Sequence, residues 1–267
     1  MNIISVSRRT DIPFYYHKWF KEKLKKGFVF VKNPFNPSQE KVVSLKKKDV
    51  VGFVFWSRNY ENFFDVFEKL KEENIFFYLH FTLNNYPLKI EPYLKYYKIN
   101  FFIEQLNYIS KIIGAERIWW RYDPVFITDK MDYRFHKDNF YFLCKSLKGA
   151  VGRCITSIYS PYKKSERRFK KLNIKVSLPP LKLFENFREI ADFFNVKLYA
   201  CSSPLLQEAG LPPAGCISFD FIKMHLSKPI FFKSKKVPTR QNCTCDYAID
   251  IGFYSSCKSK CVYCYAV

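Results

Sequence analysis

Glycine is scarce in this sequence, with 8 among 267 residues, and no glycine-rich fingerprint follows any strand-like run. Dinucleotide-binding and P-loop proteins need such glycines, because only a bare backbone can approach the phosphates closely. No apolar run reaches the roughly 20 residues that cross a bilayer. The amino-terminal residues also lack the charged, apolar and small-residue regions of a secretory signal. These absences argue against nucleotide-fingerprint enzymes and membrane proteins, and they favour a cytoplasmic location.

Acidic residues are few beside basic ones, with 24 Asp and Glu against 45 Lys and Arg and a net charge of +21. Such an excess attracts polyanions such as nucleic acid or phosphorylated small molecules. However, the lysines are dispersed along the chain, and abundant Lys, Phe, Tyr, Ile and Asn also suit the compositional drift of an AT-rich genome. The charge therefore leaves both interpretations open.

Short β-branched and aromatic runs alternate with amphipathic patterns along the chain. The predicted strands are residues 3–7, 51–56, 75–82, 117–122, 151–157 and 196–201, with a further apolar run at 248–254. The predicted helices are residues 15–26, 61–73, 101–113, 135–147 and 183–194. This alternation predicts a parallel α/β fold, either an open doubly wound sheet or a partial TIM-like β/α barrel of six to seven strands. We favour the barrel, with residues 1–226 forming it and the cysteine-rich residues 227–267 packed at its mouth in one structural unit.

Cysteine is abundant, and five of the nine cysteines fall between Cys243 and Cys264. In a reducing compartment, clustered cysteines hold metals more often than they form disulfides. The spacing Cys257-x3-Cys261-x2-Cys264 puts three thiolates on one short loop, and cysteine thiolates are the usual ligands of iron–sulfur clusters. Three ligands leave one iron of a [4Fe-4S] cluster open to another molecule. A structural zinc site that also uses Cys243 and Cys245 is the main alternative.

Several stretches resemble an uncharacterised bacterial domain family, a domain of unknown function whose carboxy-terminal cysteines are similar to the cluster motif of radical S-adenosylmethionine (SAM) enzymes. They are residues 3–13, 31–37, 54–59, 120–124 and 250–254, followed by the cysteine motif through Ala266. The aromatic Tyr263 before the last cysteine is a further feature of that superfamily. The resemblance implies a [4Fe-4S] cluster, SAM as cofactor, and an electron donor such as flavodoxin or ferredoxin.

The position of the motif departs from that superfamily, in which the cysteine loop usually follows the first barrel strand. Here it lies at the carboxy-terminal end of the sequence. One explanation is a permuted order, in which residues 248–254 occupy the first-strand position and residues 3–7 follow in space. The other is a tail folded over the barrel mouth. No counterpart of the usual glycine-rich SAM-binding segment is evident.

Four other cysteines are candidates for a second cluster or a zinc site: Cys201, Cys216, Cys243 and Cys245. The alternative for Cys201 and Cys216 is that they are small buried apolar residues. Cys144 falls in a helical apolar pattern and Cys154 in a strand, and we predict both to be core.

Polar residues follow the predicted strands where parallel βα architectures build their active sites. The catalytic candidates are Arg8, Arg9, Asp11, His80, Arg121 and Asp123. The cofactor-binding candidates are Tyr263, Ser57, Arg58, Thr156 and Ser157. For some of them a structural role is an alternative: a salt bridge from the Arg8–Asp11 loop to Asp123, and a core hydrogen bond for His80. Trp56, Trp119 and Trp120 are expected to pack rather than stack on bases.

The sequence therefore predicts a radical SAM-like enzyme with a [4Fe-4S] cluster on Cys257, Cys261 and Cys264. Its substrate is not indicated beyond a preference for nucleic acid or a phosphorylated small molecule, and no membrane partner is expected. The alternative is a non-catalytic nucleic-acid-binding protein stabilised by zinc or by a cluster.

Overall fold

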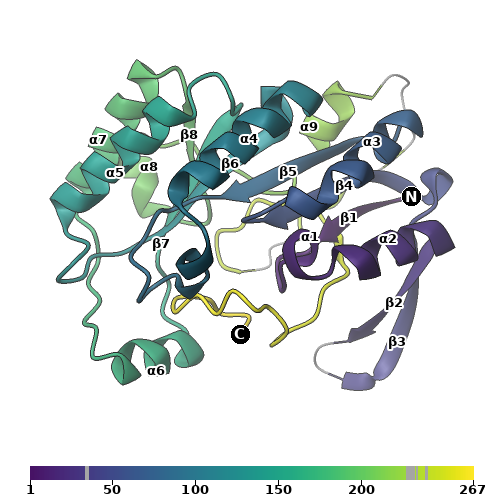
Figure 1. The fold of residues 1–267 in the computed structure, drawn as a ribbon, viewed down its shortest axis with the longest axis horizontal. Helices are drawn as coiled ribbons and strands as arrows, with labels where there is room; N and C mark the ends of the chain where they lie inside the picture. The colour runs from purple at the N-terminus through teal and green to yellow at the C-terminus, as the bar shows by residue number, and fades with distance from the viewer. Residues whose placement is uncertain (34–35, 227–231, 233, 238–239) are drawn as a thin grey trace.

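A parallel β-sheet forms the centre of the protein. The computed structural model describes residues 1–33, 36–226, 232, 234–237 and 240–267. The sheet has seven strands in the order β8-β7-β6-β5-β4-β1-β9, and every neighbouring pair is parallel (Figure 1). The strands are β1 (Asn2–Val6), β4 (Val50–Ser57), β5 (Phe77–Thr82), β6 (Ile118–Val125), β7 (Arg153–Ile158), β8 (Lys197–Ala200) and β9 (Ile249–Asp250). The predicted α/β class is confirmed, as a partial TIM-like or Rossmann-like sheet flanked by helices.

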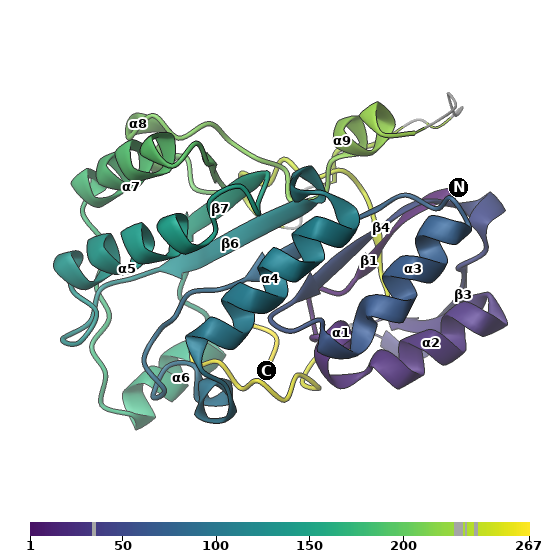
Figure 2. The same ribbon diagram turned by 45° about the horizontal axis from the view of Figure 1, so that its top comes forward.

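Helices connect successive strands, and the longer ones among α1–α5 and α7 cover one side of the sheet (Figures 1 and 2). The helices are α1 (Ile12–Tyr15), α2 (His17–Lys26), α3 (Phe64–Glu72), α4 (Ile99–Ile113), α5 (Tyr133–Ser146), α6 (Lys163–Lys171), α7 (Leu181–Phe193), α8 (Leu205–Glu208) and α9 (Phe219–Met224). Short 3-10 turns lie at Lys47–Asp49, Glu61–Phe63, Pro92–Tyr96 and Ala115–Arg117. Within the described ranges, none of these helices has the length and apolar character needed to cross a membrane.

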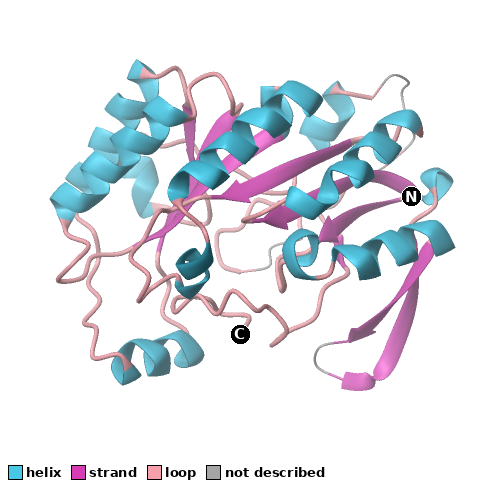
Figure 3. Ribbon diagram, in the orientation of Figure 1, coloured by secondary structure: helices cyan, strands magenta, loops and turns pink. Residues whose placement is uncertain are grey.

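The two faces of the sheet pack against different parts of the chain, because successive side chains of a strand point to opposite faces. Phe53, Phe55 and Phe77 belong to the large core cluster that includes the helix residues. Val54 and Tyr78 belong to a second buried cluster, together with residues between Ala214 and Ala248. The carboxy-terminal part of the chain thus fills the face that the βα helices leave uncovered, largely as loop (Figure 3).

The sequence prediction missed an antiparallel hairpin of β2 (Phe28–Asn33) and β3 (Asn36–Ser44), which stands beside the sheet. The Phe-Val-Phe-Val run at residues 28–31 is an aromatic and β-branched pattern that indicates a strand. Helix α6 was missed because seven of its nine residues are charged, Lys-Lys-Ser-Glu-Arg-Arg-Phe-Lys-Lys. The last strand, β9, pairs over two residues only, although a run at 248–254 was predicted.

Strand β9 lies directly beside β1, on the side away from β4. Ile4 and Ser5 of β1 pair in parallel with Ile249 and Asp250. In space, the last strand therefore comes before the first, as the permuted arrangement predicts.

Candidate metal and active site

The chain leaves β9 at the carboxyl edge of the sheet and turns immediately beside β1. A Cβ atom on Gly252 would lie 2.0 Å from the Ser7 Oγ atom, so a glycine is needed for this close approach. The following residues cross the edge as a loop, between α1 and α6 (Figures 1 and 2). We call residues 257–264, which carry Cys257, Cys261 and Cys264, the cysteine loop.

The carboxylate of Asp250, at the end of β9, gathers the residues that follow β1. It accepts hydrogen bonds from the hydroxyls of Ser5 and Ser7 and, at 2.8 Å, from the backbone N–H of Arg8. The Nε atoms of Arg8 and Arg9 lie 3.8 and 3.9 Å from its oxygens. The predicted salt bridge from this loop to Asp123 is therefore wrong: the arginines pair with Asp250, because β9 adds a strand end next to them.

Side chains from several elements hold the cysteine loop in place. Arg168 on α6 donates hydrogen bonds to the carbonyls of Val262, Cys264 and Val267. Tyr15 Oη lies 3.0 Å from Ser259 Oγ, and the backbone N–H of Val262 donates to the carbonyl of Ile90 at 3.0 Å. The loop thus has a defined course over the sheet edge, although it contains neither helix nor strand.

The three thiols of the loop lie close enough to influence one another. Burial raises the pKa of Cys257 and raises that of Cys261 strongly, and the charges of the neighbouring cysteines add to both shifts. Cys261 is buried, whereas Cys257 and Cys264 are half-buried. Three thiols on one loop suit an iron–sulfur cluster as a donor set. As the side chains stand, however, no three His, Cys, Asp or Glu residues in the described ranges are grouped to hold a metal ion.

A buried polar network lies directly under the cysteine loop. Arg58 donates from Nη1 to Glu91 at 2.9 Å and from Nη2 to the hydroxyl of Tyr263 at 2.6 Å. Tyr263 in turn donates to Glu91, whose side chain is fully buried. Asn84 donates to Glu91 at 3.0 Å and to Tyr263 at 2.9 Å. Of these residues the sequence prediction contained Arg58 and Tyr263 as site residues, and it missed Glu91.

Asp11 joins the same region from the amino-terminal end of α1. Its carboxylate accepts hydrogen bonds from Ser57 Oγ at 2.6 Å, from the Arg58 backbone N–H at 3.1 Å and from the Phe14 backbone N–H at 3.1 Å. Burial raises the pKa of Asp11 to about 6, although the hydrogen bond from Ser57 opposes the shift. Asp11, Ser57 and Arg58, predicted from two separate strand ends, therefore belong to one group.

A second group of predicted residues lies on β5, β6 and β7. Arg121 Nη2 is 2.5 Å from Asp123 Oδ2, and Ser157 donates to the same carboxylate. The Arg121 charge helps to hold the pKa of Asp123 below its ordinary value, against the effect of burial. Asn84 connects the two groups, because its Oδ1 accepts from the Asp123 backbone N–H at 2.9 Å.

His80 packs in the core and makes a hydrogen bond there, which was the structural alternative to a catalytic role. Its ring stacks on Trp56 with centroids 3.9 Å apart, and Nε2 lies 2.7 Å from the carbonyl oxygen of Cys216. Burial, together with the Arg121 charge, holds its pKa well below the ordinary value. Thr156 is fully buried on β7, and its hydroxyl has no hydrogen-bond partner in the described part of the chain. Trp119 and Trp120 are fully buried, as predicted for packing residues.

The four other cysteines predicted as ligands come together on the face of the sheet opposite the longer helices. The Sγ atoms of Cys201 and Cys216 are 3.2 Å apart. The thiols of Cys216 and Cys243 lie close enough to Cys245 to affect its pKa: Cys216 lowers it, whereas Cys243 and burial raise it, and the overall shift is upward. We call Cys201, Cys216, Cys243 and Cys245 the thiol cluster. Cys144 and Cys154 lie elsewhere in the buried core, as predicted.

Comparison with known protein families gives one assignment. The family model for a domain of unknown function (DUF1848) matches residues 3–266, nearly the whole chain. The chain belongs to this family. A search of curated proteins found no match. The assignment confirms the uncharacterised family that the sequence resembles, and it attaches no activity to the DUF1848 fold.

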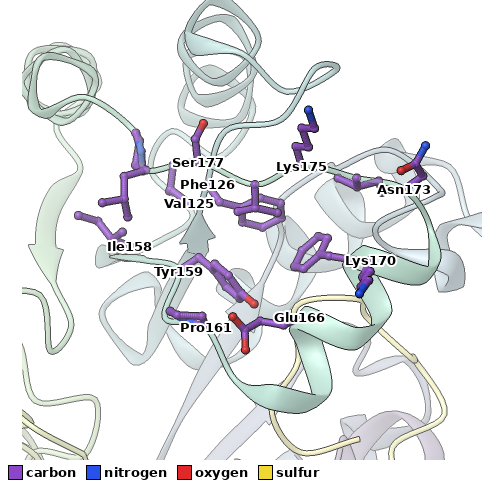
Figure 4. A pocket seen from close by; sticks show the side chains of 15 residues that line it. Val125, Phe126, Ile158, Tyr159, Pro161, Glu166, Lys170, Asn173, Lys175 and Ser177 are labelled. Atoms are coloured by element: carbon purple, nitrogen blue, oxygen red, sulfur yellow. The ribbon is translucent and has the colours of Figure 1, made fainter.

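Two hollows flank the cysteine loop in this DUF1848 chain. One, of about 710 Å³, lies beyond the ends of β6 and β7 and beside α6, with Phe126, Tyr159 and Phe169 among its walls (Figure 4). The Phe126 ring contacts that of Tyr263, with centroids 5.9 Å apart. The other, of about 440 Å³, lies between β9 and the β2–β3 hairpin, and its lining combines the basic Arg8, Arg9, Lys32 and Lys41 with the acidic Glu40, Asp246 and Asp250.

Proposed function

We propose that this protein is a radical SAM-like enzyme whose cysteine loop binds a [4Fe-4S] cluster through Cys257, Cys261 and Cys264. The observation that carries the proposal is the parallel pairing of β9 with β1. Because of it, the cysteine loop follows a strand that precedes β1 in space, at the carboxyl edge of a parallel sheet. A permuted chain would have this relation between its cysteine loop and its sheet. Active sites of parallel α/β folds lie at that edge.

Cys257, Cys261 and Cys264 would hold the cluster, and the cluster together with SAM would supply one-electron radical chemistry for hydrogen abstraction from a substrate. The protein supplies position and exclusion of water. The end of the cysteine loop would be held by Arg58 and Glu91, because both form hydrogen bonds with Tyr263 of that loop and with each other.

Arg8 and Arg9 are the strongest candidates for binding an anionic group. Their side chains are about one-fifth exposed, at 20% and 22%, and they line the hollow of mixed charge beside β9. Guanidinium groups suit carboxylates and phosphates, including those of SAM or of a nucleotide. The buried side of the site would be formed by Arg121, Asp123, Ser157 and His80. His80, which is neutral, would hold its neighbours in position.

The substrate that these features fit best has a flat apolar part and a phosphate. The hollow in Figure 4 offers aromatic walls with Lys170 and Lys175 in its lining, and the chain carries a net charge of +21. A nucleotide or nucleic acid has both chemical features. An external electron donor such as flavodoxin or ferredoxin would be needed to reduce the cluster.

The test is anaerobic purification and reconstitution with iron and sulfide. We expect about four iron atoms per chain and production of 5′-deoxyadenosine from SAM under reducing conditions. The triple variant Cys257→Ser, Cys261→Ser, Cys264→Ser should lose both, whereas the core variant Cys144→Ser should keep both. Absence of iron from the reconstituted protein would refute the proposal.

The thiol cluster favours a second candidate, a non-catalytic nucleic-acid-binding protein that zinc stabilises. That protein would bind heparin with an affinity that falls steeply with salt, and it would contain zinc but cleave no SAM. Retention on heparin together with SAM cleavage would instead support the enzyme and its nucleic-acid substrate.

A further inference from the structure

The thiol cluster combines side chains from distant parts of the sequence. Cys201 directly follows β8, Cys216 follows a loop that pairs with β8, and Cys243 and Cys245 come from the segment before β9. All four are buried, with exposures between 3% and 8%. Such convergence is rare for cysteines that serve only as small apolar side chains.

The backbone around the thiol cluster is shaped for this convergence. A Cβ atom on Gly215 would lie 2.7 Å from the carbonyl oxygen of Thr244, so only glycine lets the Cys216 loop approach the residue between Cys243 and Cys245. The backbone N–H of Asp246 donates to the carbonyl of Ile217 at 2.9 Å. Tyr78 Oη donates to the Cys216 carbonyl at 3.0 Å. These contacts hold the Cys216 loop against the segment that carries Cys243 and Cys245.

Two guanidinium groups point at the sulfur atoms. Arg121 Nη1 is 2.9 Å from Cys216 Sγ, and Arg240 Nη2 is 3.3 Å from Cys201 Sγ. A neutral thiol is a weak hydrogen-bond acceptor, whereas a thiolate is a strong one. Asp123 offsets one of these positive charges through its pairing with Arg121. The positive charge that remains is too small to balance four thiolates by itself. It is compatible with four thiolates that also share a divalent cation.

We propose that Cys201, Cys216, Cys243 and Cys245 form a mononuclear tetrathiolate site for Zn²⁺, separate from the cysteine loop. Around a tetrahedral zinc ion with Zn–S bonds of about 2.3 Å, neighbouring sulfurs stand about 3.8 Å apart. The Cys201–Cys216 distance of 3.2 Å is shorter than that value, so these two sulfurs would move slightly apart on binding. A [4Fe-4S] cluster would spread its ligands farther, because four irons lie between them. Zinc binding would turn the thiols toward one centre and release their protons.

The site would fasten the described parts of residues 214–248 onto the face of the sheet opposite the longer helices. This segment supplies three of the four ligands, and it has little regular secondary structure apart from α9 in its described residues. A structural zinc ion contributes directly to folding in such segments. The role is distinct from catalysis, so the proposal stands or falls independently of the proposed function.

The experiment uses the full-length triple variant Cys257→Ser, Cys261→Ser, Cys264→Ser, which has no cysteine-loop ligand. Metal analysis should find one zinc per chain, and Co²⁺ substitution should give the visible absorption of a tetrahedral tetrathiolate complex. Adding Cys201→Ser and Cys243→Ser should remove the zinc and the cobalt spectrum. Adding Cys144→Ser and Cys154→Ser instead should leave both unchanged.

A second measurement guards against misfolding of the cysteine variants. Removing zinc from the triple variant with a chelator should make four thiols newly reactive per zinc released, with re-addition of Zn²⁺ restoring their protection. A metal-free protein, an iron cluster on these cysteines, or a Cys201–Cys216 disulfide in protein purified without oxygen would each overturn the proposal. Loss of iron from the triple variant would leave it intact.

Discussion

The two cysteine groups differ in how the chain assembles them. The cysteine loop takes its three cysteines from eight consecutive residues, and two of them are half-buried at the sheet edge. The thiol cluster takes four buried cysteines from three segments, spanning residues 201–245. A compact, partly exposed motif can expose its metal to a second molecule, as catalysis requires. A buried, dispersed one encloses its metal, as structural sites do. Under the two proposals, similar ligands would serve a catalytic metal in one place and a structural metal in another.

Removing one ligand from each group tests whether the two proposed metal sites are independent. Cys261→Ser should reduce SAM cleavage at least ~100-fold, since a missing ligand destabilises the cluster, while zinc content stays at one per chain. Cys243→Ser should lower zinc content and the free energy of unfolding, because a structural zinc contributes to folding. Iron, zinc and 5′-deoxyadenosine would be measured on the same preparations. If both variants lost both metals together, the two sites would not be independent.

The buried charge pair under the cysteine loop gives the next largest expected effect. Glu91→Gln should cost about 3–5 kcal/mol of unfolding free energy, because it leaves the Arg58 guanidinium buried without its anion. Denaturant unfolding of the apoprotein would measure it. The variant should also lose iron faster to a chelator but retain zinc, because Glu91 contacts Tyr263 and not the thiol cluster.

The matched control is Glu185→Gln, which breaks the exposed pair with Lys182 on α7. It should cost less than about 1 kcal/mol. Equal effects of the two variants would show that the Glu91 network does not support the cysteine loop.

The sequence indicated the cysteine loop from local spacing, whereas it indicated the thiol cluster only from the number of remaining cysteines. The spacing of Cys257, Cys261 and Cys264 is local, so the ligand set can be read before the fold is known. The parallel sheet was also predictable, because its buried strands are continuous apolar runs. The convergence of the other cysteines depends on tertiary packing that no local pattern encodes.

The position of Glu91 likewise depends on tertiary packing that no local pattern encodes. It precedes Pro92 in a loop, and only the fold places it beneath Tyr263, 172 residues away. Asp250 likewise became a partner for Arg8 and Arg9 only when β9 joined the sheet next to β1. Such long-range polar contacts set the site, and the sequence indicated their residue types without their pairing.

A buried histidine that contacts none of the seven cysteines in the two groups provides a pH reference. His136 on α5 lies beside Tyr122 and the Phe126 carbonyl, and burial lowers its pKa to about 4. Because the folded pKa is depressed, its contribution is fully present above the unfolded value near 6.5 and is lost as pH falls toward 4. A shift of this size corresponds to ~3 kcal/mol.

Unfolding measured between pH 7 and pH 4 should therefore show a smaller loss of stability in His136→Gln than in the unmodified chain. The same difference should be seen in the triple cysteine variant, since His136 contacts neither metal group. A pH dependence that disappears in the triple variant would assign the titration to the cysteine loop instead.

Arg168 offers the smallest and most specific change to the cysteine loop. From α6 it donates to the carbonyls of two cysteine-loop residues, Val262 and Cys264, and to that of Val267, whereas the adjacent Arg167 has an exposed side chain. Arg168→Gln should cost about 2 kcal/mol, since charge-assisted hydrogen bonds are each worth roughly 1.5–3 kcal/mol and glutamine can replace part of them. It should speed iron loss to a chelator and leave zinc release unchanged, while Arg167→Gln should affect neither. Faster zinc release in Arg168→Gln would mean that the cysteine loop and the thiol cluster share a support. The separation of a catalytic from a structural metal site would then need to be abandoned.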